Sequence, residues 1–326
     1  MPPARPLLID TDLSFDDYVA VLYLLQHPAV DVRALTVANG VVHVRQGVEN
    51  ARRVLALAGR PEIPVAGGPE KPLSGDRTFP KRWRTILDYV PRLFLPRVPP
   101  HPVPLSAPAL ISQHCRTSDT PLTFVALGPL TNLALALQAD PTLPQHLARI
   151  FISGGAVHVP GVIAEDVPGH PNRVAEWNFY LDPEAAEIVF QSGIPITLIP
   201  MDATHVTGPA PLLFPRPFVR RLRASARTPA SRFMARFIAI WQWATPQFQA
   251  TPVWDAVSAV LLTDPEVGTT WQELPLRVVT HPDEVAGHTR VESDQPPCVR
   301  VCLGGDQAAF EAAFENIVKT PTKKAG

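Results

Sequence analysis

The sequence has 326 residues, which is enough to bury a large core as one α/β unit or as two domains. Its formal net charge of -1 gives no indication of nucleic acid or an anionic membrane as a partner. The three cysteines are scattered, and neither a signal-peptide pattern nor an apolar run long enough to span a bilayer is present, so a cytoplasmic enzyme is expected.

Apolar runs and helical periodicity alternate along the chain. The first predicted strand ends at Ile9, and an apolar face that starts at Tyr18 predicts the first helix. Further strands are predicted at residues 32–38, 64–68, 122–127, 150–153, 196–200, 274–280 and 299–302. Further helices are predicted at residues 44–58, 107–115, 133–138, 183–190, 219–245, 255–262 and 306–318. The proline-rich segment 69–104 and the polar segment 157–175 are predicted to be irregular.

This alternation predicts an α/β fold with a mainly parallel open sheet and helices on both faces. No internal repeat or clear linker divides the chain, so a single domain is expected over residues 1–320, with a frayed tail at 321–326. In such sheets, ligands bind outside the carboxyl ends of the strands. Asn39, Leu127 and Asp202 each lie at or just after the end of a predicted strand, so one crevice is expected to gather them.

Four carboxylates lie within eight residues where the first strand meets the first helix: Asp10, Asp12, Asp16 and Asp17. Mutual repulsion and lost hydration would make this arrangement costly without a cation. Short acidic side chains supply hard oxygen ligands, and a helix N-terminus supplies donors that fix them. The turn therefore predicts a divalent metal site. The alternative is a solvated acidic turn in which Asp16 or Asp17 caps the helix.

Five blocks of sequence, in one order, resemble the calcium-dependent nucleoside hydrolases. The blocks are Asp10-Thr11-Asp12 with Asp16-Asp17, Ala126-Leu127-Gly128-Pro129-Leu130-Thr131-Asn132, Gly154-Gly155-Ala156, Ala175-Glu176-Trp177-Asn178 with Asp182-Pro183-Glu184-Ala185-Ala186, and Trp254-Asp255-Ala256. The resemblance therefore extends from the first strand to the helix that follows Trp254. It implies a Rossmann-like nucleoside hydrolase fold, a small-molecule nucleoside substrate, and a homo-oligomer such as a dimer or tetramer.

The resemblance also implies how a metal would be held. Asp12, Asp17, Asp255 and the backbone carbonyl of Leu127 would bind Ca²⁺, with ribose hydroxyls and a water completing the shell. Asp12 would take a proton from the calcium-bound water that attacks the anomeric carbon, and Asp10 would support the site from behind. From the residues alone, Asp255 could equally be a helix N-cap.

The ribose hydroxyls would be bound by Asp16, Glu176 and Asn178, which would favour an oxocarbenium-like transition state. Two other positions depart from the family pattern. Val41 stands where the family usually has Asn or Asp, with Asn39 two positions earlier. Gly161-Val162 replaces the family's Gly-Asn, so Asn172 or His170 is the candidate substitute from the same loop.

Two tryptophans resemble those that clamp the base in the purine-preferring branch of the family. Trp83 lies within the basic stretch Phe79-Pro80-Lys81-Arg82-Trp83-Arg84, and Trp254 precedes Asp255 where other branches have a histidine that protonates the leaving base. Stacking on Trp254 would then have to make the purine easier to protonate from solvent. The alternative is that both tryptophans only cover apolar surface.

Two functions are therefore considered. The first is hydrolysis of purine ribonucleosides to free base and ribose, which the retained Asp12 and Asp17 favour. The second is calcium-dependent binding of ribose or nucleosides with weak or altered turnover, which Val41 and Val162 favour. An aspartyl-nucleophile phosphatase also begins with a strand and Asp-x-Asp, but the paired Asp16-Asp17 and the later blocks do not belong to that pattern.

Overall fold

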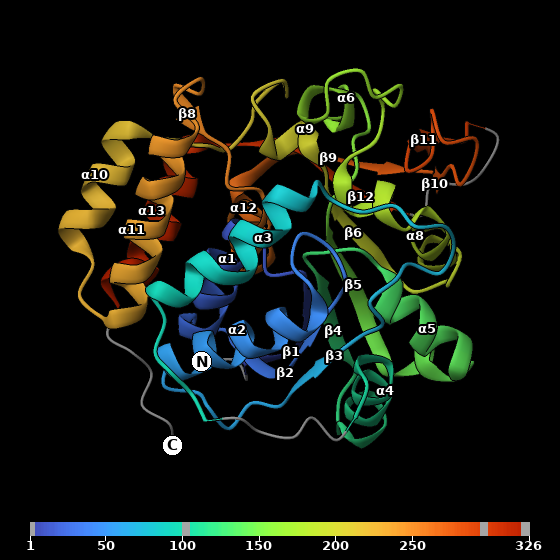
Figure 1. Ribbon diagram of the computed structural model, residues 1–326, viewed down its shortest axis with the longest axis horizontal. Coiled ribbons are helices and arrows are strands. Elements are labelled where there is room, and N and C mark those ends of the chain that lie inside the picture. Colours follow the sequence, from blue (N-terminus) through green and yellow to red (C-terminus); the bar gives the residue numbers. More distant parts are fainter. Residues whose placement is uncertain (1–3, 100–104, 294–298, 321–326) are drawn as a thin grey trace.

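The computed structural model describes residues 4–99, 105–293 and 299–320, and its centre is an eight-stranded sheet (Figure 1). In spatial order the strands are β3 (Val65–Gly67), β2 (Val30–Val37), β1 (Arg5–Thr11), β4 (Leu122–Ala126), β5 (Leu147–Ser153), β6 (Ile196–Ile199), β12 (Val299–Gly305) and β9 (Gly268–Leu274). Every pair of neighbours is parallel except β12 and β9. The prediction of a mainly parallel sheet is confirmed.

Successive residues of the central strands pack into two separate cores. On β1, Leu7 and Ile9 contact one core and Leu8 contacts the other, because side chains along a strand point alternately to the two faces. The first core is covered by α1 (Phe15–Gln26), α2 (Val44–Leu57), α10 (Arg216–Ser225), α11 (Pro229–Ala244), α12 (Trp254–Thr263) and α13 (Gln307–Lys319). The second core is covered by α4 (Ala107–Thr117), α5 (Thr131–Ala139) and α8 (Pro183–Phe190). Helices therefore lie on both faces, as predicted (Figure 1).

Shorter elements connect these layers. The helical ones are α3 (Lys81–Tyr89), η1 (Val90–Leu93), η2 (Leu143–His146), α6 (Ile163–Asp166), α7 (Trp177–Leu181), α9 (Met201–Thr204) and η3 (Pro265–Val267). Two small antiparallel sheets pair β7 (Phe214–Pro215) with β8 (Ala250–Thr251), and β10 (Leu276–Val278) with β11 (Thr289–Val291). The predicted frayed tail and Cys298 lie outside the described residues.

The prediction of an irregular segment over residues 69–104 is wrong for residues 81–93, which form α3 and η1. The only buried residue of α3 is the polar Asp88, and only Trp83 and Leu87 pack partly against the core, so the helix has too narrow an apolar stripe to detect. Contacts with α2 and the residue before it fix α3 instead. The backbone N–H of His43 donates to Asp88 Oδ1 at 3.0 Å, and Asn50 Nδ2 donates to the Asp88 carbonyl at 3.4 Å.

Three further element predictions need correction. The segment 157–175, predicted to be irregular, contains the short helix α6. Residues 219–245 form two helices, because Thr228 caps α11 by accepting a hydrogen bond from the N–H of Ser231 at 3.0 Å and Pro229 occupies its first turn. Of the strand predicted at 274–280, Leu274 ends β9 and residues 276–278 form β10. The edge strand β9 was missed because most of its side chains are exposed and polar or partly buried, so no apolar run marks it.

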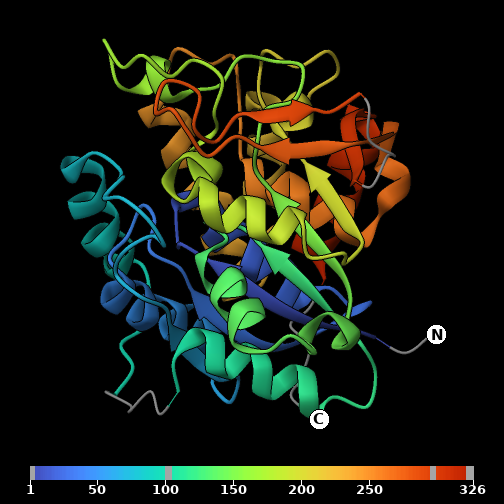
Figure 2. The ribbon, with the colours of Figure 1, turned by 90° about the vertical axis from the view of Figure 1, so that its right-hand side faces the viewer.

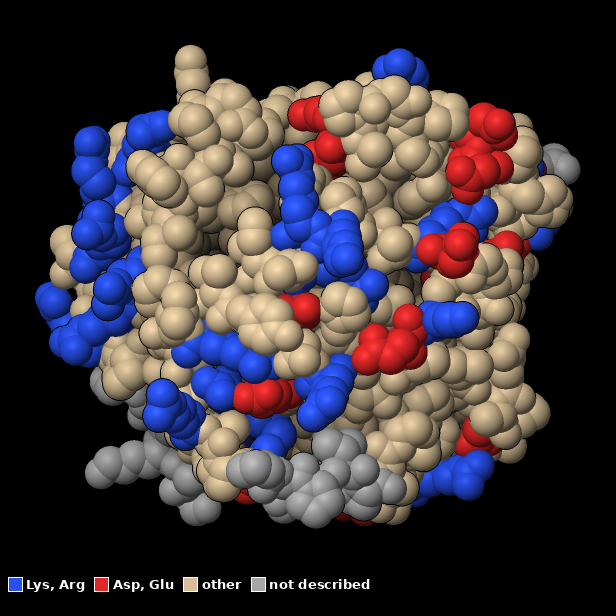
Figure 3. All heavy atoms as spheres, viewed as in Figure 1, with Lys and Arg blue, Asp and Glu red and all other residues tan. Residues whose placement is uncertain are grey.

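The parallel strands all end on one edge of the sheet. Figure 2 shows the arrows of β4, β5 and β6 pointing toward the side on which α3 and α6 lie. On the face shown in Figure 3, Lys and Arg side chains gather over α10 and near α3, although the net charge of the whole chain is only -1. The carboxyl edge of the sheet is where the predicted site residues converge.

Candidate active site

The acidic turn between β1 and α1 is held by its own side chains. Leu13 has a positive φ of 53°, a left-handed conformation that is uncommon for a branched residue and concentrates at functional sites. The hydroxyl of Thr11 donates to Asp17 Oδ1, and the N–H of Ser14 donates to Asp17 Oδ2 at 3.0 Å. The hydroxyl of Ser14 donates to Asp16. Both carboxylates are therefore fixed at the first turn of α1.

Asp255 joins these two carboxylates from the first turn of α12, which packs against α1. Asp16, Asp17 and Asp255 each offer a carboxylate oxygen, and these oxygens all lie within 4.8 Å of one another. The N–H of Asp255 also donates to Asp16 Oδ2 at 3.3 Å. All three residues are buried. The structure thus brings Asp255, which lies far from the other two in the sequence, next to Asp16 and Asp17 in the first turn of α1.

Burial and mutual repulsion raise the pKa values of this group. Burial, followed by neighbouring carboxylates, raises the pKa of Asp17 and Asp255 well above the usual range for aspartate. Burial also raises the pKa of Asp16. Buried carboxylates in such contact require protons or a cation to balance them. A donor set of carboxylate oxygens fits a hard divalent cation, which prefers oxygen ligands.

Asp12 lies beside this group of three without being part of it. Burial raises its pKa to about 6, with a further contribution from Asp16, and its charge contributes to the raised pKa of Asp17 and Asp255. Its Oδ2 accepts a hydrogen bond from the N–H of Val41 at 2.7 Å. This hydrogen bond comes from the backbone of Val41, so it does not depend on the Val41 side chain.

Two glycines allow loops to approach Asp12 closely. A Cβ at Gly40 would lie 2.0 Å from Asp12 Oδ2, and one at Gly128 would lie 2.9 Å from the Asp12 backbone nitrogen. Any side chain at Gly40 would displace the carboxylate. The close approach to Asp12 therefore explains on steric grounds why position 128 is a glycine. Gly40 adds a second steric constraint, which sequence reasoning missed.

Asp10 lies behind the acidic turn. Its Oδ1 accepts hydrogen bonds from Thr36 Oγ1 at 2.5 Å and from Asn132 Nδ2 at 2.8 Å, which ties β1 to β2 and α5. Burial, followed by repulsion from Asp12, raises its pKa to about 7 against the lowering effect of these hydrogen bonds. Its supporting role in the site stays a prediction.

Leu127, Glu176 and Asn178 meet at the ends of β4 and β5. Asn178 Nδ2 donates to the carbonyl of Leu127 at 3.2 Å and to that of Ser153 at 3.1 Å. Glu176 caps α7 by accepting from the N–H of Asn178 at 2.8 Å, and it accepts from the N–H of Gly155 at 2.9 Å. Burial raises the pKa of Glu176 to about 7.

Asn39 and Asn172, the candidates for the missing ribose contacts, are both engaged elsewhere. Asn39 Oδ1 accepts from Arg84 Nη2 at 2.6 Å. Asn172 Oδ1 accepts from the N–H groups of two residues of its own loop, and its Nδ2 donates to the carbonyls of Asp283 and Ala286. These four bonds use the full capacity of the Asn172 amide. Its predicted contact with ribose stays a prediction, and its contacts are those of a loop anchor.

The two tryptophans lie in different aromatic groups. The Trp83 ring lies 6.2 Å from that of Phe79 and 6.1 Å from that of Trp177. The Trp254 ring lies 6.3 Å from that of Phe15 and 6.5 Å, at an interplanar angle of 7°, from that of His205. Both tryptophans are half-buried. A clamp formed by both rings stays a prediction.

Sequence reasoning missed two residues at this edge. Arg84 links α3 to Asn39 and to the carbonyl of Val42, and its only signal was the basic stretch around Trp83. His205 follows α9, is buried parallel to Trp254, and shares a hydrogen bond of 2.9 Å with Thr207 Oγ1 through Nδ1. Burial lowers its pKa, which favours the neutral imidazole. Its proximity to Asp202 after a predicted strand was the only signal.

The whole arrangement has a counterpart in a known family. The chain matches the model of the inosine-uridine preferring nucleoside hydrolases over residues 7–312. The chain belongs to this family. The resemblance carried by the five sequence blocks is therefore confirmed, and so is the α/β fold that it implies.

Curated relatives of this nucleoside hydrolase include pyrimidine-specific enzymes. The pyrimidine-specific ribonucleoside hydrolase RihA of Klebsiella pneumoniae is 34% identical over 273 residues, which cover 82% of this chain and 82% of the relative. RihA of a Shewanella species is 40% identical over 204 residues, 62% of this chain and 60% of the relative.

Solved structures of similar proteins cover the chain almost completely. A plant nucleoside hydrolase has a TM-score of 0.83 and 28% identity, covering 98% of this chain and 100% of the other. An inosine-guanosine nucleoside hydrolase has a TM-score of 0.76 and 25% identity with the same coverage. A purine-preferring ribonucleoside hydrolase from Gardnerella vaginalis, at 24% identity and a TM-score of 0.81, supports the fold alone. Within residues 4–99, 105–293 and 299–320, no helix has the length and apolar character needed to cross a membrane.

Proposed function

We propose that this nucleoside hydrolase cleaves the N-glycosidic bond of purine ribonucleosides to give free base and ribose, with Ca²⁺ as its metal. The observation that carries the hydrolase proposal is the convergence of three buried carboxylates beside Asp12 at the carboxyl edge of the sheet. The preference for purines rests on Trp254, which directly precedes Asp255 and presents a half-buried ring at the same helix terminus.

Asp17 and Asp255, with Asp12 and the carbonyl of Leu127, would hold the cation. When bound, a divalent cation supplies Lewis acidity and an anchor for vicinal hydroxyls. The carbonyl of Leu127 has a second lone pair beside the one that Asn178 uses, so it can accept this further contact. The carboxylates must lose their protons for this role, and the hydrogen bonds on Asp17 favour its charged form.

Asp12 is the proposed general base. The N–H of Val41 holds its Oδ2 and so fixes the carboxylate that would accept a proton from an attacking water. With a pKa of about 6 in the metal-free protein, Asp12 is a stronger base than an exposed aspartate, and a nearby cation would lower that value.

Ribose is proposed to lie between Asp16, Glu176 and Asn178. Glu176 is held by two backbone N–H groups, and Asn178 by two carbonyls, so both are fixed before substrate arrives. Carboxylates arranged in this way stabilise the positive charge that develops on the sugar as the bond to the base breaks. Preorganised groups of this kind need no reorientation during the reaction.

Pyrimidine ribonucleosides are the second candidate substrates, because the relative that is 34% identical over most of this chain is a pyrimidine-specific enzyme. Against them stands Trp254, which supplies no acid for the leaving pyrimidine. His205, behind Trp254, is 3% exposed and hydrogen-bonded, so it is poorly placed to reach a leaving group directly.

The test is release of reducing sugar from inosine, guanosine, adenosine, uridine and cytidine in the presence of Ca²⁺. We expect the purine ribonucleosides to have the higher kcat/KM. Preference for uridine or cytidine would replace the purine proposal with the pyrimidine one. Saturable binding without sugar release from any of the five would instead support a binding protein, the reading that Val41 and Val162 favour.

A further inference from the structure

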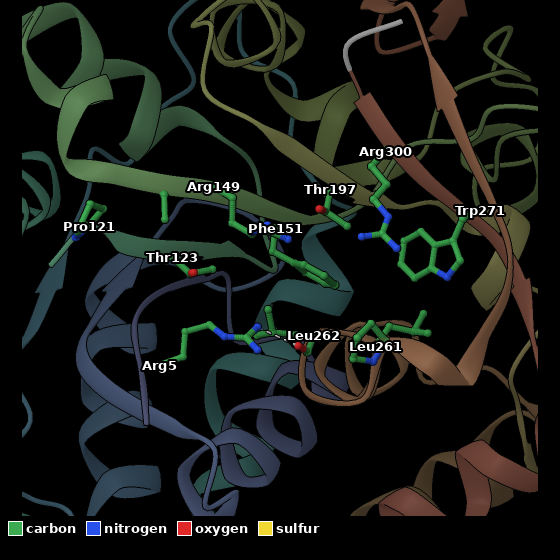
Figure 4. Close-up of a pocket in the computed structure, with 12 residues that line it drawn as sticks. Arg5, Pro121, Thr123, Arg149, Phe151, Thr197, Leu261, Leu262, Trp271 and Arg300 are labelled. Atoms are coloured by element: carbon green, nitrogen blue, oxygen red, sulfur yellow. Dashed lines mark hydrogen bonds between the residues drawn. The ribbon is translucent and has the colours of Figure 1, made fainter. Parts of the chain in front are cut away.

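A cavity lies at the opposite edge of the sheet from Asp16, Asp17 and Asp255, which together are called the acidic cluster below. Figure 4 shows this cavity, whose volume is about 390 Å³, between the amino-terminal ends of the strands and the last turn of α12. Its polar lining comes from Arg5, Thr123, Arg149, Thr197 and Arg300, and its apolar lining from Pro121, Ala148, Phe151, Leu261, Leu262, Pro265 and Trp271. A volume of this order suits a small organic ligand.

Sheet register places the polar groups in one row. Thr123 is paired with Arg149, and Thr197 is paired with both Phe151 and Arg300. Paired residues on neighbouring strands point to the same face of a sheet. Figure 4 shows Thr197 between Arg149 and Arg300. The row therefore gathers two guanidinium groups and two hydroxyls on one wall.

The polar side chains of this row form few contacts within the described part of the protein. Across the described ranges 4–99, 105–293 and 299–320, neither Arg149 nor Arg300 forms an ion pair. Arg300 instead lies over the Trp271 ring, with its guanidinium carbon 4.4 Å from the ring centroid. Among the residues that the structure describes, no Asp or Glu lines the cavity. Glu273, the cross-strand partner of Arg300, is exposed and forms no ion pair with it.

Arg5, the third arginine of the lining, offsets a negative charge that would oppose anion binding. The C-terminal end of a helix carries partial negative charge, and α12 ends beside the cavity. Arg5 Nη1 donates to the carbonyl of Leu262 at 3.1 Å and so offsets that charge. The cavity keeps a net positive lining.

We propose that this cavity binds an organic phosphate monoester. The phosphate lies between Arg149 and Arg300, whose planar guanidinium groups match phosphate oxygens, and the threonine hydroxyls donate to it. The organic part lies against Phe151, Leu262 and Trp271. The site is separate from the acidic cluster, because α12 and β5 each have one end at the cavity and the other at the cluster edge.

The test uses the full chain and calorimetric titration with phenyl phosphate and with inorganic phosphate. Phenyl phosphate has no ribose hydroxyls, so the proposed ribose site cannot hold it in the way it would hold a nucleoside. We expect phenyl phosphate to bind more tightly than inorganic phosphate, because only the ester reaches the apolar wall. Absence of saturable heat at millimolar phenyl phosphate, or equal affinity for both probes, would overturn the proposal.

Variants locate the binding. Arg149→Gln should weaken phenyl phosphate binding about tenfold or more, as expected for loss of a charge-assisted hydrogen bond, and Arg149→Lys should restore part of it. The Arg149 side chain is exposed and forms no ion pair among the described residues, so the fold should survive the substitution. An unchanged Tm would verify this. Arg220→Gln, which removes an equal charge from the exposed face of α10, is the matched control and should bind normally.

Asp17→Asn distinguishes the cavity from the acidic cluster. Phenyl phosphate should bind this variant as it binds the unaltered protein, whatever happens to nucleoside hydrolysis. Loss of binding in Asp17→Asn with retained binding in Arg149→Gln would place the probe in the acidic site and reject the cavity.

Discussion

Asp12 has one observed hydrogen bond and one proposed chemical role, and a substitution can separate the two. Asp12→Asn keeps an oxygen for the N–H of Val41 but loses the base and one charge. We expect kcat to fall on the order of a hundred- to ten-thousand-fold, the usual effect of removing a general base, with Tm changed little or raised because repulsion is relieved. The measurement is kcat at saturating Ca²⁺ together with a melting curve.

Asp182→Asn is the matched control for that variant. Asp182 is also a fully buried carboxylate that accepts backbone N–H groups, at Leu73 and Ala185, but it lies outside the acidic cluster. Its substitution should lower Tm and leave kcat near normal. Near-normal turnover of Asp12→Asn would reject Asp12 as the base.

Trp254 is the residue on which the purine proposal depends. Trp254→Ala should reduce kcat/KM for purine ribonucleosides by an amount that corresponds to roughly 1–3 kcal/mol of lost stacking. A nitrophenyl riboside, whose leaving group needs no protonation, should be much less affected. The two substrates are compared on both proteins at equal Ca²⁺.

Equal losses on a purine, a pyrimidine and the nitrophenyl riboside would show that Trp254 only supports Asp255 or the fold. Trp254→His should raise activity on pyrimidine ribonucleosides, since it supplies an acid at that position. Its ring would lie beside that of His205, the neighbour of Trp254 in the structure.

The acids of the first turn could be predicted from the sequence because they are close together in it. Asp16 and Asp17 lie on one turn, and their clustering alone indicates a metal site. Asp255 follows Asp16 by 239 positions, so only family resemblance could join them. The bond from Arg84 to Asn39 was not predictable, because it depends on where α3 packs.

At the scale of elements, the amide of Asn172 joins the loop 157–175 to residues 283–286. Asn172 links two N–H groups of this loop to the carbonyls of Asp283 and Ala286. Asn172→Ala removes all four hydrogen bonds, two of which, to Ala175 and Ala286, are buried, so we expect a loss of about 1–3 kcal/mol in the free energy of unfolding. The measurement is denaturant unfolding, with KM for inosine determined in parallel.

The ratio of these two effects distinguishes an anchor from a ribose ligand. An anchor predicts a clear loss of stability with a moderate change in KM. A large rise in KM without loss of stability would restore Asn172 to the ribose pocket. His170, on the same loop, shares a hydrogen bond of 3.0 Å with Tyr180, and its Nδ1 accepts from the backbone N–H of Asn172 at 3.2 Å. His170→Ala therefore offers a comparison that removes two loop contacts while keeping the four hydrogen bonds of the Asn172 side chain.

Elements with a broad apolar face were predictable, and those held by polar contacts were not. The strand β4 is buried along its whole length, so a short apolar run sufficed to predict it. In contrast, α3 is fixed through Asp88, and β9 is an exposed edge strand. Neither element has the regular spacing of apolar residues that predicts a helix or a strand from sequence.

For the whole molecule, we expect the acidic cluster to couple metal binding to stability. It joins the first turn of α1 to the first turn of α12, helices from opposite ends of the chain. Removing the cation should abolish hydrolysis and lower Tm, because the cation binds the folded chain and its loss leaves the carboxylates repelling one another. Full activity and an unchanged Tm after chelation, with metal analysis verifying removal, would contradict the site.

Asp10 and Asp12, next to this cluster, predict opposite pH dependences of stability for the metal-free and the metal-bound protein. In the metal-free protein, the folded-state pKa values of Asp10 and Asp12 are about 7 and about 6, above the ordinary value of 3.8. The folded state therefore binds more protons than the unfolded state from about pH 4 to about pH 7, so stability falls as pH rises through that window. In the metal-bound protein the ligands must be ionised, so stability should rise with pH over the same range. Melting curves of chelated and Ca²⁺-saturated protein across this window measure both slopes, and parallel slopes would show that these carboxylates do not exchange protons for a cation.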